Sequence, residues 1–127
     1  MEQHVTALRP EEPARFNPDR LERLCDEIGE VRAEHEVARA LETISRHIRT
    51  LGSITPLDDA GACCAPLRAL TATSDRIGMA TLARVARDVL ACIERRDPVA
   101  LSATYARLLR VGERSLHAIW DLEDVSG

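Results

Sequence analysis

Histidine and cysteine are the residues of this chain whose chemistry would support nucleophilic, acid–base or metal-binding activity. There are four of each, namely His4, His35, His47, His117, Cys25, Cys63, Cys64 and Cys92. The cysteines follow no metal-ligand spacing, and the neighbours Cys63 and Cys64 cannot bond to each other without strain, so we interpret all four as small buried thiols. His4 and His35 have no ligand partner three or four residues away. With no glycine-rich phosphate loop and no Ser-His-Asp arrangement in the sequence, we expect no enzymatic activity, no cofactor and no metal site.

His47 is the histidine with the most suggestive neighbours, because Arg46 and Arg49 place two cations close to it in the sequence. Cations stabilise a phosphoryl group, so this setting is compatible with an imidazole that accepts phosphate. The sequence shows no small residues around His47 comparable to those of residues 61–72, which favours a structural role for the side chain instead. His117 has no surrounding motif, and we interpret it in the same way.

Charge and hydrophobicity limit what the chain can bind. Its 127 residues carry a formal net charge of −4, every basic residue is an arginine, and acids and arginines are interleaved along the sequence. This interleaving argues against an extended phosphate-binding surface, so nucleic acid is not an expected partner. No apolar run approaches the roughly 20 residues of a membrane helix, and the first residues contain no hydrophobic signal region. We therefore expect a cytoplasmic protein that does not bind or span a membrane.

Helices must position these side chains, because the apolar residues recur at helical spacing. Aromatic residues make up only 2% of the chain, which disfavours strands. Asn17-Pro18 and Gly29 predict a helix over residues 18–28, with Asn17 as its cap and Gly29 as its end. The clearest apolar stripe comes next and ends at a glycine; it consists of Val37, Leu41, Ile44, Ile48 and Leu51, followed by Gly52.

Caps and stops predict three further helices. Thr55-Pro56-Leu57-Asp58 has the composition of an N-cap, a first-turn proline and an acid, and we expect it to open the third helix. Gly78 separates the third helix from the fourth, and Asp97-Pro98 repeats the cap and the proline at the start of the fifth. The one-faced stripes and the short connections predict an all-α fold, an up-down-up-down four-helix bundle with a short additional N-terminal helix.

The predicted domain organisation is simple, since the length suits one domain. We expect a flexible arm over residues 1–15, the helical bundle over residues 16–120 and a frayed tail over residues 121–127. The arm is polar and contains Pro10 and Pro13, whereas the tail after Trp120 is acidic.

Two stretches of the sequence resemble a known family. Phe16-Asn17-Pro18-Asp19-Arg20-Leu21 is similar to the opening segment of the histidine phosphotransfer (HPt) domains of bacterial phosphorelays, which are four-helix bundles with an extra N-terminal helix. Residues 67–78, Leu-Arg-Ala-Leu-Thr-Ala-Thr-Ser-Asp-Arg-Ile-Gly, resemble the segment that carries the family's chemistry. In the family this segment has a histidine, two residues, a lysine, a glycine, small residues and an apolar-glycine pair.

When this segment is aligned on Ile77-Gly78, the chain lacks all three signature residues of the family. Arg68 takes the place of the phosphorylated histidine, Thr71 that of the lysine and Ala72 that of the glycine. A guanidinium is permanently charged and has no usable lone pair, so Arg68 cannot attack a phosphoryl group. The resemblance therefore implies a degenerate HPt domain that lacks the phosphorylatable histidine.

Small residues share the helical stripe of Arg68 and would leave a flat strip around its guanidinium. The predicted partner-binding residues are Gly61, Ala65, Arg68, Thr71, Ala72 and Asp75. The resemblance implies that the exposed side of the second and third helices docks on a response-regulator receiver domain or a histidine kinase without accepting phosphate. A solvated surface arginine is the competing interpretation. Pro66 is a possible site of a bend just before the strip, or of a later helix start.

Two other functions stay open at this point. One is an active phosphotransfer protein that uses His47, and the other is a structural helical bundle that associates with itself through the small-residue strip. For the oligomeric state the sequence suggests a monomer or a weak homodimer.

Overall fold

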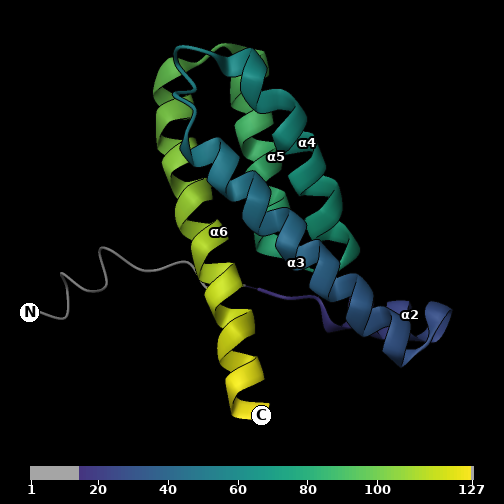
Figure 1. Ribbon diagram of the computed structural model, residues 1–127. Helices are drawn as coiled ribbons and strands as arrows, with labels where there is room; N and C mark the ends of the chain where they lie inside the picture. The colour runs from purple at the N-terminus through teal and green to yellow at the C-terminus, as the bar shows by residue number, and fades with distance from the viewer. Residues whose placement is uncertain (1–14, 127) are drawn as a thin grey trace, which may run out of the picture.

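The computed structural model describes the backbone of residues 15–126 and the side chains of residues 15–118. This part of the chain is all-helical, as predicted (Figure 1). Its helices are α2 over Pro18–Ile28, α3 over Glu30–Gly52, α4 over Ala60–Arg76, α5 over Ala80–Arg95 and α6 over Pro98–Ser126. The predicted arm lies, apart from Arg15, outside the described residues. Residues 121–126, which we expected to fray, are helical and form the last turns of α6.

The start and the end of α2 follow the predicted signals. Asn17 has an extended backbone, and its Oδ1 accepts a hydrogen bond from the N–H of Asp19 at 3.1 Å. At the other end, the N–H of Gly29 donates to the carbonyl of Cys25 at 2.8 Å. α3 begins at the next residue, Glu30, well before the apolar stripe that predicted it.

The connection between α3 and α4 differs from the prediction. Thr55 does not cap a helix, because residues 55–58 form a turn in which the N–H groups of Asp58 and Asp59 both donate to the Thr55 carbonyl at 3.0 Å. α4 begins only after Asp59, whose Oδ1 accepts a hydrogen bond from the N–H of Ala62 at 3.1 Å. Proline in the second position suits a turn as well as a first helical turn, which is why the predicted start was wrong.

Positive φ angles mark three connections between the described helices. They occur at Gly29 (+87°), Gly78 (+81°) and Arg96 (+55°). Gly52 is the last residue of α3, as predicted, but the helix ends without a left-handed glycine, since Ser53 follows with a φ of −94°. The start of α6 follows its prediction, because the Oδ1 of Asp97 accepts a hydrogen bond from the N–H of Ala100 at 3.1 Å.

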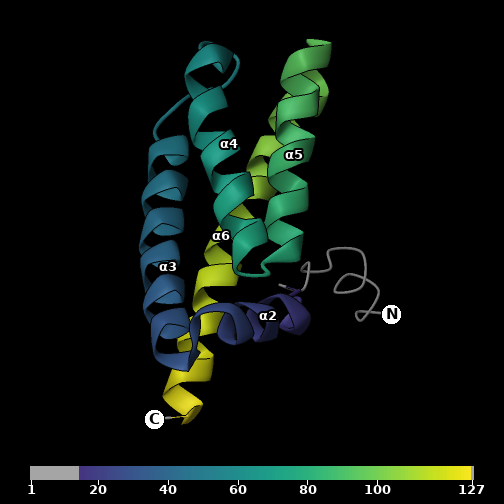
Figure 2. The same ribbon diagram turned by 90° about the vertical axis from the view of Figure 1, so that its right-hand side faces the viewer.

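The segment before α2 pairs with the connection between α4 and α5. Phe16 and Met79 form an isolated antiparallel β-bridge, and the N–H of Asn17 donates to the carbonyl of Gly78 at 2.7 Å. These contacts hold the chain at the end of α4, and α2 then lies across one end of the other helices (Figure 2).

The four longer helices share one aliphatic core. α3 packs on α4, α4 on α5 and α5 on α6, and α6 returns to α3. The largest fully buried side chains include Ile44, Leu51, Leu67, Leu70, Met79, Leu82, Val85, Val89 and Leu108. Tyr105 is a buried aromatic residue of this core, against which the partly buried Phe16 also packs, and the Tyr105 hydroxyl donates to the Leu51 carbonyl at 2.5 Å. The core therefore consists almost entirely of Leu, Ile, Val, Ala, Met and Cys, as the composition required.

α6 is longer than its neighbours. It has 29 residues against 16 in α5, which at 1.5 Å per residue makes it about 20 Å longer. Its last turns extend past α2 and past the ends of the other helices in both views (Figures 1 and 2). Over the described residues, none of the helices combines the length and the apolar character that a membrane span requires.

Candidate functional site

Arg68 lies in the middle of α4 and its side chain is exposed. The helix runs without interruption from Ala60 to Arg76 although it contains Pro66. The proline therefore does not shift the start of the helix to a position after residue 66, and it does not unwind the segment around Arg68. The structure therefore meets the two conditions on which the sequence argument depended, a helical segment and an outward side chain at position 68.

Small exposed residues surround Arg68 along the outer face of α4. Gly61, Ala65 and Ala72 are all exposed, and at 100° per residue they lie within about 60° of Arg68 around the helix axis. The inward face is formed by the buried Cys63, Leu67, Leu70 and Ser74. A partner surface approaching this face would meet backbone and methyl groups, with the guanidinium of Arg68 as the single long side chain of the strip.

Thr71 and Asp75 have partners within the chain. The Thr71 hydroxyl donates to the carbonyl of Leu67, one turn earlier in α4, at 2.9 Å. The Asp75 carboxylate forms an ion pair with Arg87 on α5, and its backbone carbonyl accepts a hydrogen bond from Nε of Arg20 at 3.2 Å. Both residues are half-buried and border the strip. Thr71 bonds within α4, whereas Asp75 links α4 to α5 and to α2.

A groove of about 420 Å³ runs beside Arg68 between α4 and α5. Its lining consists of Cys64, Arg68, Arg87, Leu90, Ala91, Ile93 and Glu94. Two guanidinium groups from different helices therefore border one groove, together with a single carboxylate, that of Glu94. Arg87 is not among the predicted residues, because the sequence pattern shows that α5 has a polar face but not which helix that face lies beside.

His47 is half-buried on the side of α3 that faces α4. Glu36 of α3 forms an ion pair with Arg76 of α4, and His47 follows Glu36 by three helical turns, so both lie on the same face. Burial, and next the charge of Arg46, lower the pKa of His47 below 6.5. Both causes favour the neutral imidazole.

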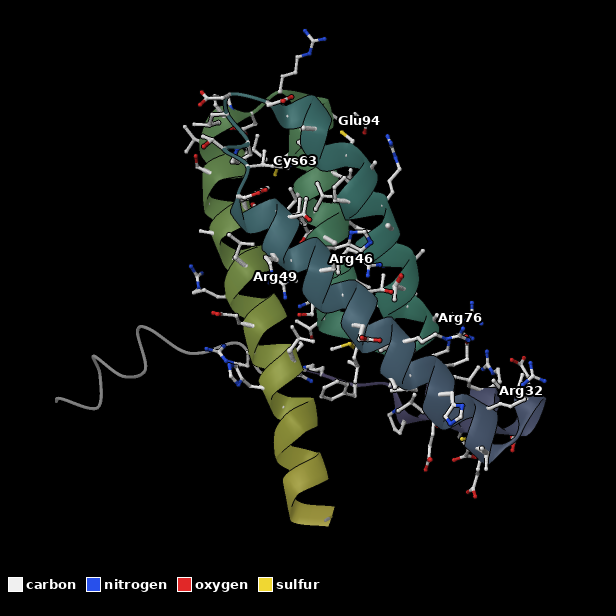
Figure 3. All side chains as sticks on the ribbon, in the orientation of Figure 1. Arg32, Arg46, Arg49, Cys63, Arg76 and Glu94 are labelled. Atoms are coloured by element: carbon white, nitrogen blue, oxygen red, sulfur yellow. The ribbon has the colours of Figure 1, made fainter. Side chains whose placement is uncertain are left out.

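The expectation that two arginines flank His47 is wrong for one of them. Arg46 is exposed beside it, but Arg49 lines a different groove, between α3 and α6. Figure 3 shows the two labelled arginines on opposite edges of α3. Residues two positions apart on a helix point about 200° from each other, which separates Arg49 from the imidazole.

The remaining candidates show no arrangement for chemistry. His35 and His117 are exposed, and His4 lies outside the described residues. The four cysteines are free thiols; Cys63 and Cys92 are buried as predicted, whereas Cys25 and Cys64 are only partly buried. Burial is the main cause that raises the pKa of Cys63. Within the described residues, no three His, Cys, Asp or Glu side chains come together to hold a metal ion.

Comparisons with protein-family models, with curated proteins and with solved structures find no match to this chain. The candidate site is therefore defined by its own geometry, namely the exposed strip of α4 and the groove with two arginines beside it.

Proposed function

We propose that this chain is a non-catalytic adaptor with an HPt-like fold, which docks on a receiver domain or a histidine kinase of a two-component phosphorelay and accepts no phosphate. The fold is an up-down-up-down bundle of α3, α4, α5 and α6 with α2 as the additional N-terminal helix. The pairing of each long helix with the next, and of α6 with α3, supports this topology.

The observation that carries the proposal is the exposed Arg68 among the small residues of the α4 strip. Receiver domains present acidic side chains and a phosphorylated aspartate, and a guanidinium binds both with paired hydrogen bonds. Gly61, Ala65 and Ala72 let the partner's backbone come close to the helix, as a docking face requires. No lone pair is available at position 68 to take over a phosphoryl group, so the contact ends in binding.

Arg87 strengthens this argument. It borders the same groove from α5 and is held by Asp75 in an ion pair whose two side chains are about half exposed. Such surface pairs contribute only about 0.5 kcal/mol, so Arg87 can exchange the Asp75 carboxylate for an acidic group of a partner at little cost. The docking face then extends over α4 and α5, rather than over α3 and α4 as the sequence suggested.

A binding titration tests this function. The full chain is titrated by calorimetry against receiver domains and kinase domains of its source organism, with Arg68→Glu and Arg68→Glu/Arg87→Glu as test variants. Charge reversal at Arg68 should weaken binding about tenfold, and the double variant should bind less still. Arg110→Glu is the matched control, because Arg110 is also exposed on a helix but lies on α6. Equal affinities of Arg68→Glu and the control would contradict the proposed face.

A second function has one observation in its favour. A phosphate-accepting histidine must be neutral, and the lowered pKa of His47 favours that form. Incubation of the chain with a phosphorylated receiver distinguishes the two. The adaptor should acquire no acid-labile phosphate, whereas labelling that disappears in His47→Gln would establish a phosphotransfer protein.

A further inference from the structure

A second groove, of about 480 Å³, lies between α3 and α6. Its lining consists of Ser45, Ile48, Arg49, Leu109, Glu113, Leu116 and His117. It shares no residue with the groove beside Arg68, so it is a separate surface. Three aliphatic side chains form its apolar part, and three titratable or charged side chains accompany them.

The groove exists because α3 and α6 touch closely at one place and then separate. At Gly112 an added Cβ would lie 2.5 Å from Cδ1 of Ile48, so the absence of a side chain lets the two helices meet there. From this crossing α3 runs toward α2, while α6 continues past the other helices (Figure 1). The widening angle between the two helices leaves a groove above Ile48 and Leu116, which are themselves largely buried and form part of its floor.

The projecting end of α6 has a composition that suits this groove. Four of its residues are apolar and three are acidic, and none is basic; in chain order they are Ile119, Trp120, Asp121, Leu122, Glu123, Asp124 and Val125. The groove offers aliphatic side chains together with the exposed Arg49, and its one acid is the exposed Glu113. Apolar groups therefore match apolar groups, and Arg49 of α3 is the cation with which the acids of the projecting end would pair.

The end of α6 cannot reach the groove of its own molecule. α6 is one continuous helix from Pro98 to Ser126, and it supplies four of the groove residues from its own middle. A straight helix does not fold back on itself, so an occupant with this sequence must come from a second molecule.

We propose that two copies of this chain associate through α6, with the projecting end of each α6 packed in the groove between α3 and α6 of the other copy. Such an arrangement has twofold symmetry, and each contact occurs twice. The eight residues 119–126 span about 12 Å, so the buried area lies at the lower end of the range for specific interfaces. The dimer therefore dissociates on dilution.

Sedimentation equilibrium and tryptophan fluorescence test the association with the full chain. The average mass should rise from 14.0 kDa toward twice that value as the concentration increases. Trp120 is the only tryptophan of the chain and lies in the projecting end, so its emission should shift to shorter wavelength over the same concentration range. A chain that stays monomeric at all concentrations would overturn the proposal.

A charge exchange identifies the surface. Arg49→Glu, and separately Glu123→Arg/Asp124→Arg, should each weaken self-association at least about fivefold, because each brings like charges together in both contacts. Mixed in equal amounts, the two variants should form a heterodimer, since opposite charges then meet in both contacts. Arg68→Glu is the matched control and should dimerise normally. A dimer that is unaffected by Arg49→Glu but blocked by a bulky residue at Ala72 would place the interface on α4 and refute this assignment.

Discussion

Replacement of Gly78 by alanine should destabilise the fold strongly, because two independent costs coincide at this residue. Gly78 has a φ of +81°, and a Cβ built on it would lie 2.6 Å from the backbone oxygen of Asn17 and 3.1 Å from Cβ of Arg20. The left-handed backbone costs a non-glycine residue about 1.5 kcal/mol. The contact with a backbone oxygen adds about 1.5 kcal/mol, because the oxygen cannot rotate away as a side chain would.

The total for Gly78→Ala is thus about 3 kcal/mol of unfolding free energy, which for a domain of this size corresponds to a fall in Tm of about 12 °C. Urea unfolding followed by far-ultraviolet circular dichroism measures the loss directly. Gly61→Ala is the matched control, since its Cβ would meet only Oδ1 of Asp59 at 3.8 Å, and it should be neutral or slightly stabilising.

Gly78→Asn separates the two costs. Asparagine tolerates a positive φ better than alanine does, but its Cβ meets the same oxygen. If Gly78→Asn recovers the full stability, the contact with Asn17 is not a real constraint. If Gly78→Ala itself loses less than about 1 kcal/mol, the tight junction between the start of α2 and the end of α4 is not formed as described.

Three further substitutions have defined outcomes. Ser74→Ala should stabilise the protein by about 1 kcal/mol in urea unfolding, because the fully buried Ser74 hydroxyl has no hydrogen-bond partner among the described residues; a loss of stability would show that the hydroxyl is bonded. Tyr105→Phe should cost about 1 kcal/mol, because the Leu51 carbonyl loses its hydroxyl donor, although the N–H of Ile54 still donates to it at 3.2 Å; a neutral result would contradict the bond to Tyr105. Burial and Arg46 lower the pKa of His47, so the folded state binds a proton less readily than the unfolded state; its contribution to stability is complete above pH 6.5 and is lost as the pH falls through the folded pKa. His47→Gln should flatten this part of the pH profile, and an unchanged profile would refute the assignment.

The sequence was sufficient where local chemistry decides the structure. Asn17 and Asp97 cap α2 and α6 as predicted, because an N-cap needs only a side-chain oxygen and the next two or three N–H groups. The prediction from the sequence was wrong at Thr55, because the same local pattern also suits a turn. Whether a turn or a helix forms there depends on how α4 packs on the core. Asp59 offered an equally good cap, four residues later.

In the candidate site, too, features set by local spacing could be predicted, and features set by the packing of helices could not. The exposure of Arg68 follows from helical periodicity, which places it opposite the buried Leu67, Leu70 and Ser74 side of α4. The presence of Arg87 beside it depends on which face of α5 lies against α4, and no spacing within one helix contains that information. The separation of Arg49 from His47, by contrast, follows from spacing within α3, because residues two positions apart point about 200° from each other. Only the helix that lies beside Arg49, namely α6, depends on the packing of the bundle.

The two proposed surfaces have a joint consequence that can be measured. A dimer formed through α6 holds two Arg68 faces at a fixed separation, since the grooves of the two surfaces share no residue. A dimeric partner would then engage both faces, and its second contact would form at high effective concentration. Arg49→Glu should therefore weaken binding to a dimeric partner immobilised at low density by about tenfold, while its affinity for a monomeric receiver domain stays unchanged. Equal losses for both partners would show that Arg49 belongs to the docking face itself, and the separation of the two surfaces would be wrong.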